Sequence, residues 1–483
     1  MAIHLTRGPG RIEFRADDPS LTAYAGLAVS GELVRSLRLM ELIDAELSAA
    51  RSAPVKLRRR GLSAGGLVLA LAESQLVGGE CFDDVERVRA DRAGALLRAV
   101  AQFPSAPTAR QLAYKFRPGH IRAIERAQAR VGNALDRSLG RDVGEDVTFD
   151  LDATESKVFG RLKRGAGRSR HGHLAYNSYT VTWADRGRAL TGELKGGNQA
   201  RIKACESLAM LRRAKRLLPV GHGQITGRFD SGFYAVELMI GCRQEQIRFT
   251  MSATRTSAMW AKLKEIPDDA WVDAIDMAGA QAAEIALTPE GWKHEPLRLI
   301  VRRVPVTAEE VQATSPRARR RKTIPPEQLA MVLGGELDST YAYSFIVTDI
   351  PACEKPTAEV EHFHRQRAQI EERFKDAKLG QALRHLPSGK LAANQLWLAC
   401  SLLALNICAW LCDISPAAAA SGQAADPRTP LRRHAKTLRR IIFCVPGRIA
   451  RSARQTIVHL PEDFPDFELL NATYHAALAL PGP

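Results

Sequence analysis

The spacing of apolar residues changes from a helical to a strand-like period near residue 146. Before that point, apolar residues recur every three to four positions in the segments 30–47, 66–79 and 119–135, a spacing that predicts amphipathic helices. Turns rich in Gly, Pro and Arg separate these segments. We therefore expect residues 1–140 to form a helical N-terminal domain.

After that point, residues 147–154 (VTFDLDAT) alternate between apolar and polar side chains, which predicts a strand with one buried face. Residues 179–195 follow as a hairpin. Helix, strand, helix and strand are then predicted, in that order, over residues 198–218, 224–229, 234–246 and 247–253. This order indicates a mixed α/β sheet, whose ligand crevice is expected at the carboxyl ends of its parallel strands.

Changes in composition divide the remaining chain. Residues 255–345 hold two strand-like runs and a basic stretch, SPRARRRKT, and are predicted to form a β-rich insertion subdomain with a basic loop. The core, begun by residues 141–254, resumes over 346–415, and the linker SPAAAASGQAADP leads to a basic C-terminal region, 416–483. As a helix, the apolar run 396–412 would span only about 25 Å, short of a membrane core of ~30 Å, so we expect it to be buried in the protein.

The charge balance indicates the kind of partner. The chain has 483 residues, enough for roughly three domains, and its 69 Lys and Arg against 53 Asp and Glu give a net charge of +16. Such a balance favours a polyanionic partner, first of all nucleic acid, and the N-terminal domain is a candidate for DNA binding or assembly. Eight Cys occur without a C-x-x-C pair and no apolar leader begins the sequence, so we expect an intracellular protein with no membrane partner.

Acidic residues occur where chemistry is expected. Asp150 and Asp152 lie two positions apart on the predicted strand 147–154, so both point to the same side, either into water or into a site. Asp230 directly follows the predicted strand 224–229 and therefore lies at the crevice.

A predicted helix, residues 359–378, carries a third acid. At about 100° per residue, one narrow stripe holds His364, Arg367, Glu371, Lys375 and Lys378, and an apolar stripe lies beside it. Of the acids on this segment, Glu371 alone shares the stripe with the cations. Taken by itself, the stripe is typical of an i,i+4 ladder of surface salt bridges.

Asp152, Asp230 and Glu371 lie on three separate predicted elements, each at the end or the buried edge of its element. Three converging carboxylates in a basic protein indicate divalent metals, because hard oxygen ligands suit Mg²⁺ or Mn²⁺ and these ions bridge to substrate phosphates. Such a site performs phosphoryl transfer.

These residues resemble the DDE transposases of bacterial insertion sequences, and more narrowly the branch with a Tyr-Arg-Glu-Lys signature. His364, Arg367, Glu371 and Lys378 fit the spacing of that signature, with His in place of Tyr. Four further stretches are similar to motifs of the family: GGECFDDVERVRAD at 78–91, DAT at 152–154, GGN at 196–198 and RFDSGFY at 228–234. The resemblance covers most of the chain.

The resemblance implies an α/β fold with a ribonuclease H-like mixed-sheet catalytic core, a β-rich insertion and an N-terminal helical domain. It implies that Asp152, Asp230 and Glu371 are catalytic and hold two Mg²⁺ or Mn²⁺ ions, which serve cleavage of the element's terminal inverted repeats and strand transfer to target DNA. DNA contacts are expected from His364, Arg367, Lys375, Lys378, Arg317, Arg319, Arg320, Arg321 and Lys322. A homodimer on DNA and a bacterial cytoplasmic, nucleoid-associated location are implied as well.

Two alternative functions stay open. Another metal-dependent DNA nuclease would share the core, and a catalytically inactive or domesticated sequence-specific DNA-binding protein would explain the charge while leaving the acids incidental. The acid-free segments 157–170 and 428–454 are further candidate phosphate contacts, although a solvated tail explains the second equally well. For His171 and His173, a loop beside DNA is preferred over a metal site, since no partner ligands lie nearby in the sequence.

Overall fold

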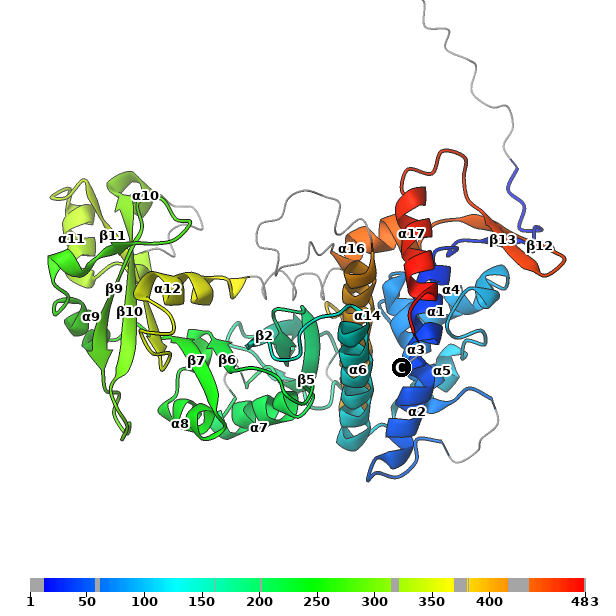
Figure 1. Ribbon diagram of the computed structural model, residues 1–483, viewed down its shortest axis with the longest axis horizontal. Coiled ribbons are helices and arrows are strands. Elements are labelled where there is room, and N and C mark those ends of the chain that lie inside the picture. The colour runs from blue at the N-terminus through cyan, green and yellow to red at the C-terminus, as the bar shows by residue number, and fades with distance from the viewer. Residues whose placement is uncertain are drawn as a thin grey trace, which may run out of the picture.

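The computed structural model describes residues 13–56, 61–160, 162–199, 202–313, 321–368, 380, 382–415 and 434–481. Figure 1 shows an elongated molecule whose parts lie in a row. A sheet covered by helices occupies the middle, and it continues at one end into a smaller α/β part. A helical unit, which includes both ends of the described chain, stands at the other end.

A ten-stranded mixed sheet runs through the middle and one end of the molecule, in the order β3-β4-β2-β6-β7-β11-β10-β9-β8, with β5 paired to β4. Its strands are β2 (Val147–Lys157), β3 (Gly167–Arg168), β4 (Leu174–Trp183), β5 (Arg188–Gly196), β6 (Ile225–Phe229), β7 (Ile247–Ser252), β8 (Val272–Asp273), β9 (Gln281–Leu287), β10 (Leu297–Thr307) and β11 (Ser339–Thr348). β2, β6 and β7 are parallel, whereas the pairs β2–β4 and β4–β5 are antiparallel. The predicted mixed α/β sheet is confirmed.

Strand β2 is buried on both faces. Val147, Phe149 and Leu151 enter the apolar core on one face. On the other face, Asp150 and Asp152 are only 2% and 8% exposed. The alternation in the sequence identifies the apolar face, whereas burial of the acidic face depends on the segments that cover it.

Helices cover both faces of the core strands (Figure 1). α7 (Ala204–Lys215) and α8 (Val236–Gln244) lie on one face. α12 (Thr357–Arg365) lies on the other face, against β7, β9 and β10. The 3-10 turn η3 (Ser231–Phe233) follows β6 after Asp230. The end of β6 and the middle of β2 lie beside the end of α12.

The insertion between β7 and α12 extends the central sheet. β11 pairs with β7 through Ile346, Val347 and Thr348, and β10, β9 and β8 follow outward. Its helices are α9 (Ser257–Leu263), η4 (Asp268–Ala270), α10 (Ala308–Gln312) and α11 (Pro326–Gly334). The strands that the sequence predicts here complete the open edge of β7 instead of forming a sheet of their own.

The helical unit combines both ends of the described chain around one hydrophobic core. It contains β1 (Leu21–Thr22), α1 (Leu27–Ser36), α2 (Leu39–Ala49), α3 (Ala64–Leu76), η1 (Phe82–Asp84), α4 (Val85–Ala90), η2 (Ala93–Leu96), α5 (Ala106–Ala113), α6 (Pro118–Ser138), α14 (Leu391–Ile414), α16 (Ala435–Leu438), the π-helical turn η6 (Arg439–Phe443), β12 (Gly447–Ser452), β13 (Gln455–His459) and α17 (Phe467–Leu478). α17 packs against α1, and β1, β12 and β13 form a small sheet. The predicted N-terminal and C-terminal regions are therefore packed together. The predicted helix 30–47 is interrupted at Arg38, whose φ of 47° is left-handed.

Helix α14 contains the apolar run that the sequence assigns to the interior. Among the described residues, it alone is long and apolar enough to cross a membrane, yet 89% of its most apolar window is buried in the protein. It packs against α3, α6 and β5, and Asn406 Nδ2 donates to Gln128 Oε1 at 2.7 Å. Protein on all sides explains an all-apolar helix, and the prediction of a buried helix is confirmed.

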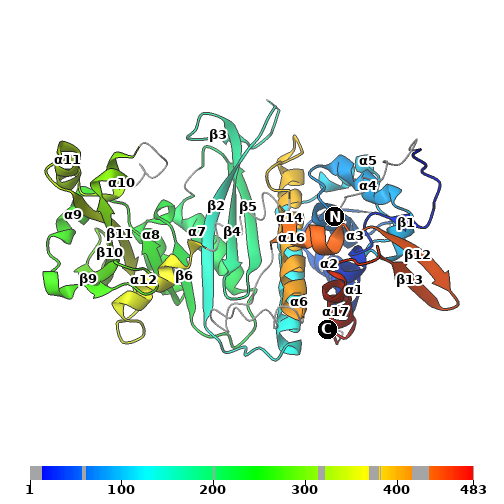
Figure 2. The ribbon, with the colours of Figure 1, turned by 90° about the horizontal axis from the view of Figure 1, so that it is seen from above.

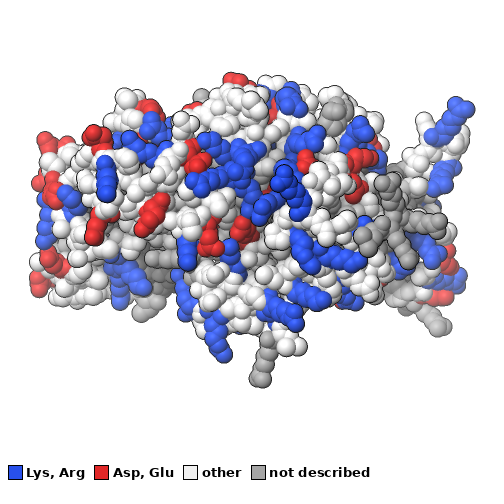
Figure 3. Space-filling view, turned by 90° about the horizontal axis from the view of Figure 1, so that it is seen from below, with Lys and Arg blue, Asp and Glu red and all other residues white. Residues whose placement is uncertain are grey.

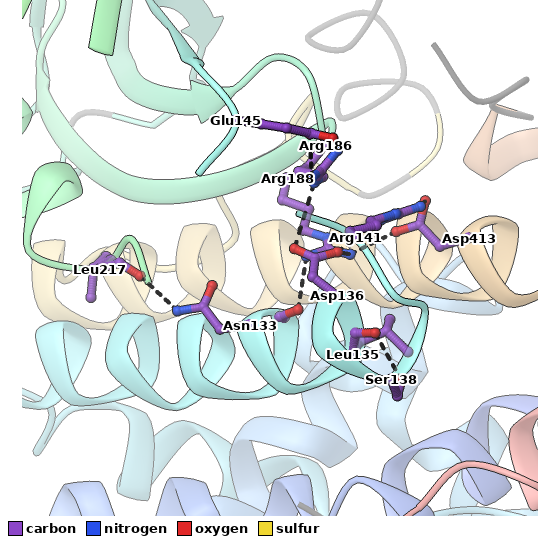
Figure 4. A network of polar contacts seen from close by, with 11 residues as sticks. Asn133, Leu135, Asp136, Ser138, Arg141, Glu145, Arg186, Arg188, Leu217 and Asp413 are labelled. Atoms are coloured by element: carbon purple, nitrogen blue, oxygen red, sulfur yellow. Dashed lines mark hydrogen bonds and ion pairs between the residues drawn. The ribbon is translucent and has the colours of Figure 1, made fainter. Parts of the chain in front are cut away.

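A group of charged side chains ties the helical unit to the sheet (Figure 4). Arg188, at the start of β5, donates to both carboxylate oxygens of Asp136 on α6, at 2.7 and 2.8 Å, and to Asp413 on α14 at 2.8 Å. Arg141 donates to the same two acids, at 2.8 and 3.0 Å. Because forked Arg–carboxylate contacts are directional, this cluster fixes α6 and α14 against the edge of the sheet.

Candidate active site

Asp152 and Asp230 lie side by side where the parallel pairing of β2 with β6 ends, Asp152 in the middle of β2 and Asp230 directly after β6. β2 pairs with β6 in a register that places Leu151 opposite Phe229, so the next residue of each chain segment is an aspartate. Asp230 caps the turn η3, with its Oδ1 accepting from the Gly232 amide at 2.8 Å. Two of the three predicted acids therefore lie together where the parallel pairing of β2 and β6 ends.

The two carboxylates differ in exposure. The Asp152 side chain is 12% exposed, and its Oδ1 accepts from the Ala153 amide at 2.7 Å. The Asp230 side chain is 42% exposed, so the pair opens to solvent on the Asp230 side. Their charge extends to Tyr179, where burial first, and then the nearby carboxylates of Asp230, Glu206 and Asp152, raises the pKa to about 12.

Arg367 bridges the two aspartates. Its Nη2 lies 3.5 Å from Asp152 Oδ1 and 3.6 Å from Asp230 Oδ2, and its side chain is 11% exposed. Arg367 follows the end of α12, so this helix delivers the guanidinium to the strand ends. A single cationic nitrogen thus occupies the point on which both carboxylates converge.

Asp150, on the same face of β2, has a different partner. Arg228 lies opposite it on β6 and donates to both of its oxygens at 2.7 Å. A third guanidinium nitrogen donates to the Phe363 carbonyl of α12 at 2.9 Å. Asp150 therefore serves, through Arg228, to hold α12 over the sheet.

The role of Arg228 was missed by reasoning from the sequence. One signal was present, because Arg228 interrupts a strand that is otherwise apolar and small (ITGRF). A buried arginine on a central strand requires a buried acid. Which acid it pairs with depends on the register between β2 and β6.

His364, which the sequence predicts as a DNA contact, lies buried under α12. Its ring is 8% exposed; Nε2 lies 2.8 Å from Ser252 Oγ and Nδ1 lies 2.9 Å from Thr250 Oγ1, both on β7. Burial, with a smaller effect of the nearby Arg367, lowers the pKa of His364 to about 3. The neutral ring fastens α12 to the sheet.

Burial of His364 makes stability depend on pH. The folded-state pKa of about 3 lies below the usual ~6.5 of an unfolded chain, so protons favour unfolding as pH falls from about 6.5 towards 3. At pH 5 the expected loss is about 2 kcal/mol relative to neutral pH. Urea unfolding at pH 7 and pH 5 should show a smaller loss for His364→Gln than for wild type. The control His171→Gln, at an exposed position, should behave as wild type; an unchanged pH dependence in His364→Gln would contradict this account.

Several predicted residues lie outside the described residues. These are Glu371, Lys375, Lys378, Arg317, Arg319 and Arg320. Of the basic loop, Lys322 is exposed, whereas Arg321 donates to the carbonyls of Val311 and Gln312, at 2.7 and 3.2 Å. Arg321 thus supports the end of α10 through its guanidinium.

The described residues contain no group of three or more His, Cys, Asp or Glu side chains placed to hold a metal ion. His173 Nε2 lies 2.6 Å from Glu155 Oε1, so His173 is paired with a single carboxylate. Asp152 and Asp230 supply two hard oxygen ligands that converge on a cation, the guanidinium of Arg367. This donor set fits a divalent metal such as Mg²⁺.

The sequence matches the family described as Transposase DDE domain group 1 over residues 7–318 and 332–481. The chain belongs to this transposase family. DNA transposition, a form of DNA recombination, is therefore the process in which this DDE transposase takes part, and divalent metal ions are the cofactors that the family generally uses.

Comparison with individual proteins adds a remote similarity. None of the curated proteins matches the transposase sequence. A solved structure that it resembles is the cryo-electron microscopy structure of the piggyBac transposase synaptic complex with hairpin DNA. The sequence identity is 9% and the TM-score 0.38, over 86% of this chain and 80% of that chain.

Proposed function

We propose that this transposase belongs to a bacterial insertion sequence of the Tyr-Arg-Glu-Lys branch, cleaves the ends of its element and joins them to target DNA. The observation that carries the proposal is the meeting of Asp152 and Asp230 where the parallel pairing of β2 and β6 ends, with Arg367 between them. Two carboxylates held around a cation in a basic protein suit the handling of a phosphodiester.

Asp152, Asp230 and Glu371 would hold the metal, with two Mg²⁺ or Mn²⁺ ions as the expected complement. The chemistry that such ions supply when bound is activation of the attacking oxygen and stabilisation of the leaving oxygen. The chain itself supplies rigidity: Asp152 is nearly buried and held by the Ala153 amide, while Asp230 is held by Gly232. Both carboxylates are therefore oriented before substrate arrives.

The positive charge of Arg367 can pair either with the two aspartates or with a phosphate. In the structure its guanidinium neutralises Asp152 and Asp230. Asp152 and Asp230 would hold a metal through these same oxygens, and Arg367 would then be free to contact a phosphate oxygen beside the site. Arg367 would thus balance charge both before and after DNA binding.

The wider surface suits DNA. Figure 3 shows Lys and Arg gathered over the middle of one face, with acidic residues more frequent towards the insertion. We assign further backbone contacts to Lys375, Lys378, Lys322 and the basic loop residues Arg317, Arg319 and Arg320. Action on two element ends makes a homodimer on DNA the expected assembly, and the bacterial nucleoid the place of action.

The proposal predicts cleavage of the DNA that flanks the gene. Purified protein with Mg²⁺ should nick duplexes carrying the terminal inverted repeats, and EDTA should abolish the reaction, because the carboxylate pair needs a divalent ion to act on a phosphate. Gel analysis of end-labelled duplexes measures the cut, with a scrambled duplex as the control. Specific binding without cleavage would contradict the proposal and indicate a DNA-binding function. Equal cleavage of the scrambled duplex would indicate a general nuclease instead.

A further inference from the structure

A β-hairpin projects from the helical unit at one end of the molecule. Its strands β12 and β13 are joined by a turn of two residues, 453 and 454, with Ser452 opposite Gln455. Every residue from 451 to 457 is exposed. Figures 1 and 2 show the two strands reaching away from the helices, on the side of the helical unit that is remote from the large sheet. The outer half of the hairpin is therefore open to solvent on both faces.

The base of the hairpin is firmly held. β12 pairs with β1. The Ile449 amide donates to the Ser20 carbonyl at 2.9 Å, and the Ala25 amide donates to the Val445 carbonyl at 2.8 Å. Gly447 is buried so close to Ala25 that an added Cβ would lie 2.9 Å from the Ala25 Cβ. The exposed tip thus stands on a fixed support.

The hairpin carries cations and no acid. Residues 434–461 contain six Lys and Arg and no Asp or Glu. Arg448, whose side chain is 65% exposed, lies 4.0 Å from Asp18 near the base. Arg451 and Arg454, at the tip, have no hydrogen-bond or ion-pair partner among the residues that the structure describes. Two unpaired cations on a projecting ribbon are complementary to a polyanion.

The other side chains at the tip are polar. Arg451 lies opposite Thr456, and Ser452 lies opposite Gln455, so each face of the ribbon ends in groups that form hydrogen bonds. Among the large apolar side chains of the two strands, Ile457 alone is exposed, by 39%. Arginine and glutamine bind the edges of guanine and adenine, and Ser and Thr bind either base. Because the centre of a protein interface is mostly apolar, this tip suits a groove of DNA better than a second copy of the chain.

We propose that the hairpin 447–459 lies in a major groove of the element-end DNA and that Arg451 and Arg454 read base edges there. The major groove is about 12 Å wide and about 8.5 Å deep, and it admits a two-stranded β-ribbon. The five residue pairs of β12 and β13 extend over about 17 Å at the rise of a strand, so the tip can reach the floor of the groove. The inference rests on the proposed function, since it takes element-end DNA as the partner.

The hairpin and the catalytic acids would contact different parts of one DNA end. The hairpin belongs to the helical unit at one end of the molecule, whereas β2 and β6, beside which Asp152 and Asp230 meet, lie in the middle (Figure 1). A duplex that reaches both therefore has its recognised groove away from the cleaved phosphate. Recognition of the end and its cleavage should then be separable by mutation.

Methylation interference tests this assignment, because dimethyl sulfate modifies guanine N7, which lies in the major groove. With full-length wild-type protein, the guanines whose methylation prevents binding should include a cluster away from the cleavage position. The double variant Arg451→Gln, Arg454→Gln should lose this cluster, and each substitution should weaken binding to end duplexes about tenfold. Thermal unfolding should be unchanged, since both side chains are exposed.

Arg130→Gln is the matched control for the loss of one exposed arginine of the helical unit. Arg130 lies on α6 with a side chain that is 60% exposed, and it is already paired with Glu46 at 3.2 Å. We expect this variant to keep the interference pattern and the affinity of wild type.

The outcomes separate the hairpin from the proposed function. If wild type binds and cleaves end DNA while the double variant keeps the interference pattern, base reading by the hairpin is overturned and the transposase function stands. If the double variant instead loses a dimer that wild type forms without DNA, as seen by light scattering, the hairpin is an interface between two copies and the inference is again overturned. If wild type neither binds nor cleaves end DNA, both inferences fall.

Discussion

Asp152→Asn is expected to reduce end cleavage on the order of a thousandfold while leaving the fold and DNA binding intact. Metal assistance to phosphoryl transfer contributes several kcal/mol, and each ~1.4 kcal/mol is a factor of ten in rate. The amide keeps the shape of the side chain and an oxygen for the Ala153 amide, which bonds Asp152 at 2.7 Å. Single-turnover cleavage of end duplexes, beside a gel-shift assay of binding, separates the two effects. Asp230→Asn should behave alike.

Two neighbouring acids serve as controls for Asp152. Asp146→Asn changes an exposed acid at the opposite end of β2, whose Oδ1 accepts from the Gln224 amide at 2.9 Å, and it should cleave at the wild-type rate. Asp150→Asn should leave a measurable fraction of cleavage, because Asp150 acts through Arg228 and not on the substrate. Equal loss in Asp150→Asn and Asp152→Asn would show that the site has been assigned wrongly.

Arg228→Met is expected to lower the free energy of unfolding by about 3–5 kcal/mol, the largest stability effect we predict. The substitution leaves Asp150, which is 2% exposed, as a buried carboxylate without its forked partner. It also removes the donor to the Phe363 carbonyl, so α12 loses a tie to the sheet. Urea unfolding at neutral pH measures the loss.

A double variant shows where the Arg228 effect comes from. If an unpaired buried charge causes the loss, Asp150→Leu combined with Arg228→Met should recover most of it, since apolar replacement of a whole buried pair is often neutral. Arg248→Met on β7 is the matched control: Arg248 pairs with Glu354 at 2.9 Å, with both side chains at least 33% exposed, and its loss should cost at most about 1 kcal/mol. A double variant as unstable as Arg228→Met would contradict the explanation.

Local patterns were enough to predict much of the core. The alternation in 147–154 identifies a strand, and Asp230 lies at the carboxyl end of a parallel strand, as expected. The apolar run 396–412 was expected to be buried because it is shorter than a membrane core, and the helix that contains it is found inside the protein. These predictions depend on the spacing of apolar residues and on the length of apolar runs, and both are set by residues that are close in sequence.

The partners of the side chains on and just after α12 could not be predicted from local patterns. The helical stripe places His364 and Arg367 on one side, yet His364 bonds Ser252 and Thr250 under the helix, while Arg367 lies beyond its end and reaches Asp152. A helical wheel gives the angle of a residue about the axis. It does not say where the helix ends or what lies against each side.

By itself, the sequence determined the type and order of the core elements, the basic character of the chain, and the placing of Asp152 on a strand and of Asp230 at a strand end. Only the tertiary structure decided that Asp150 is paired with Arg228, that His364 is buried, and that the two ends of the described chain share a core. The physical reason is that these contacts join residues far apart, 78 positions for Asp150 and Arg228. Their formation depends on strand register and helix packing, which no local pattern contains.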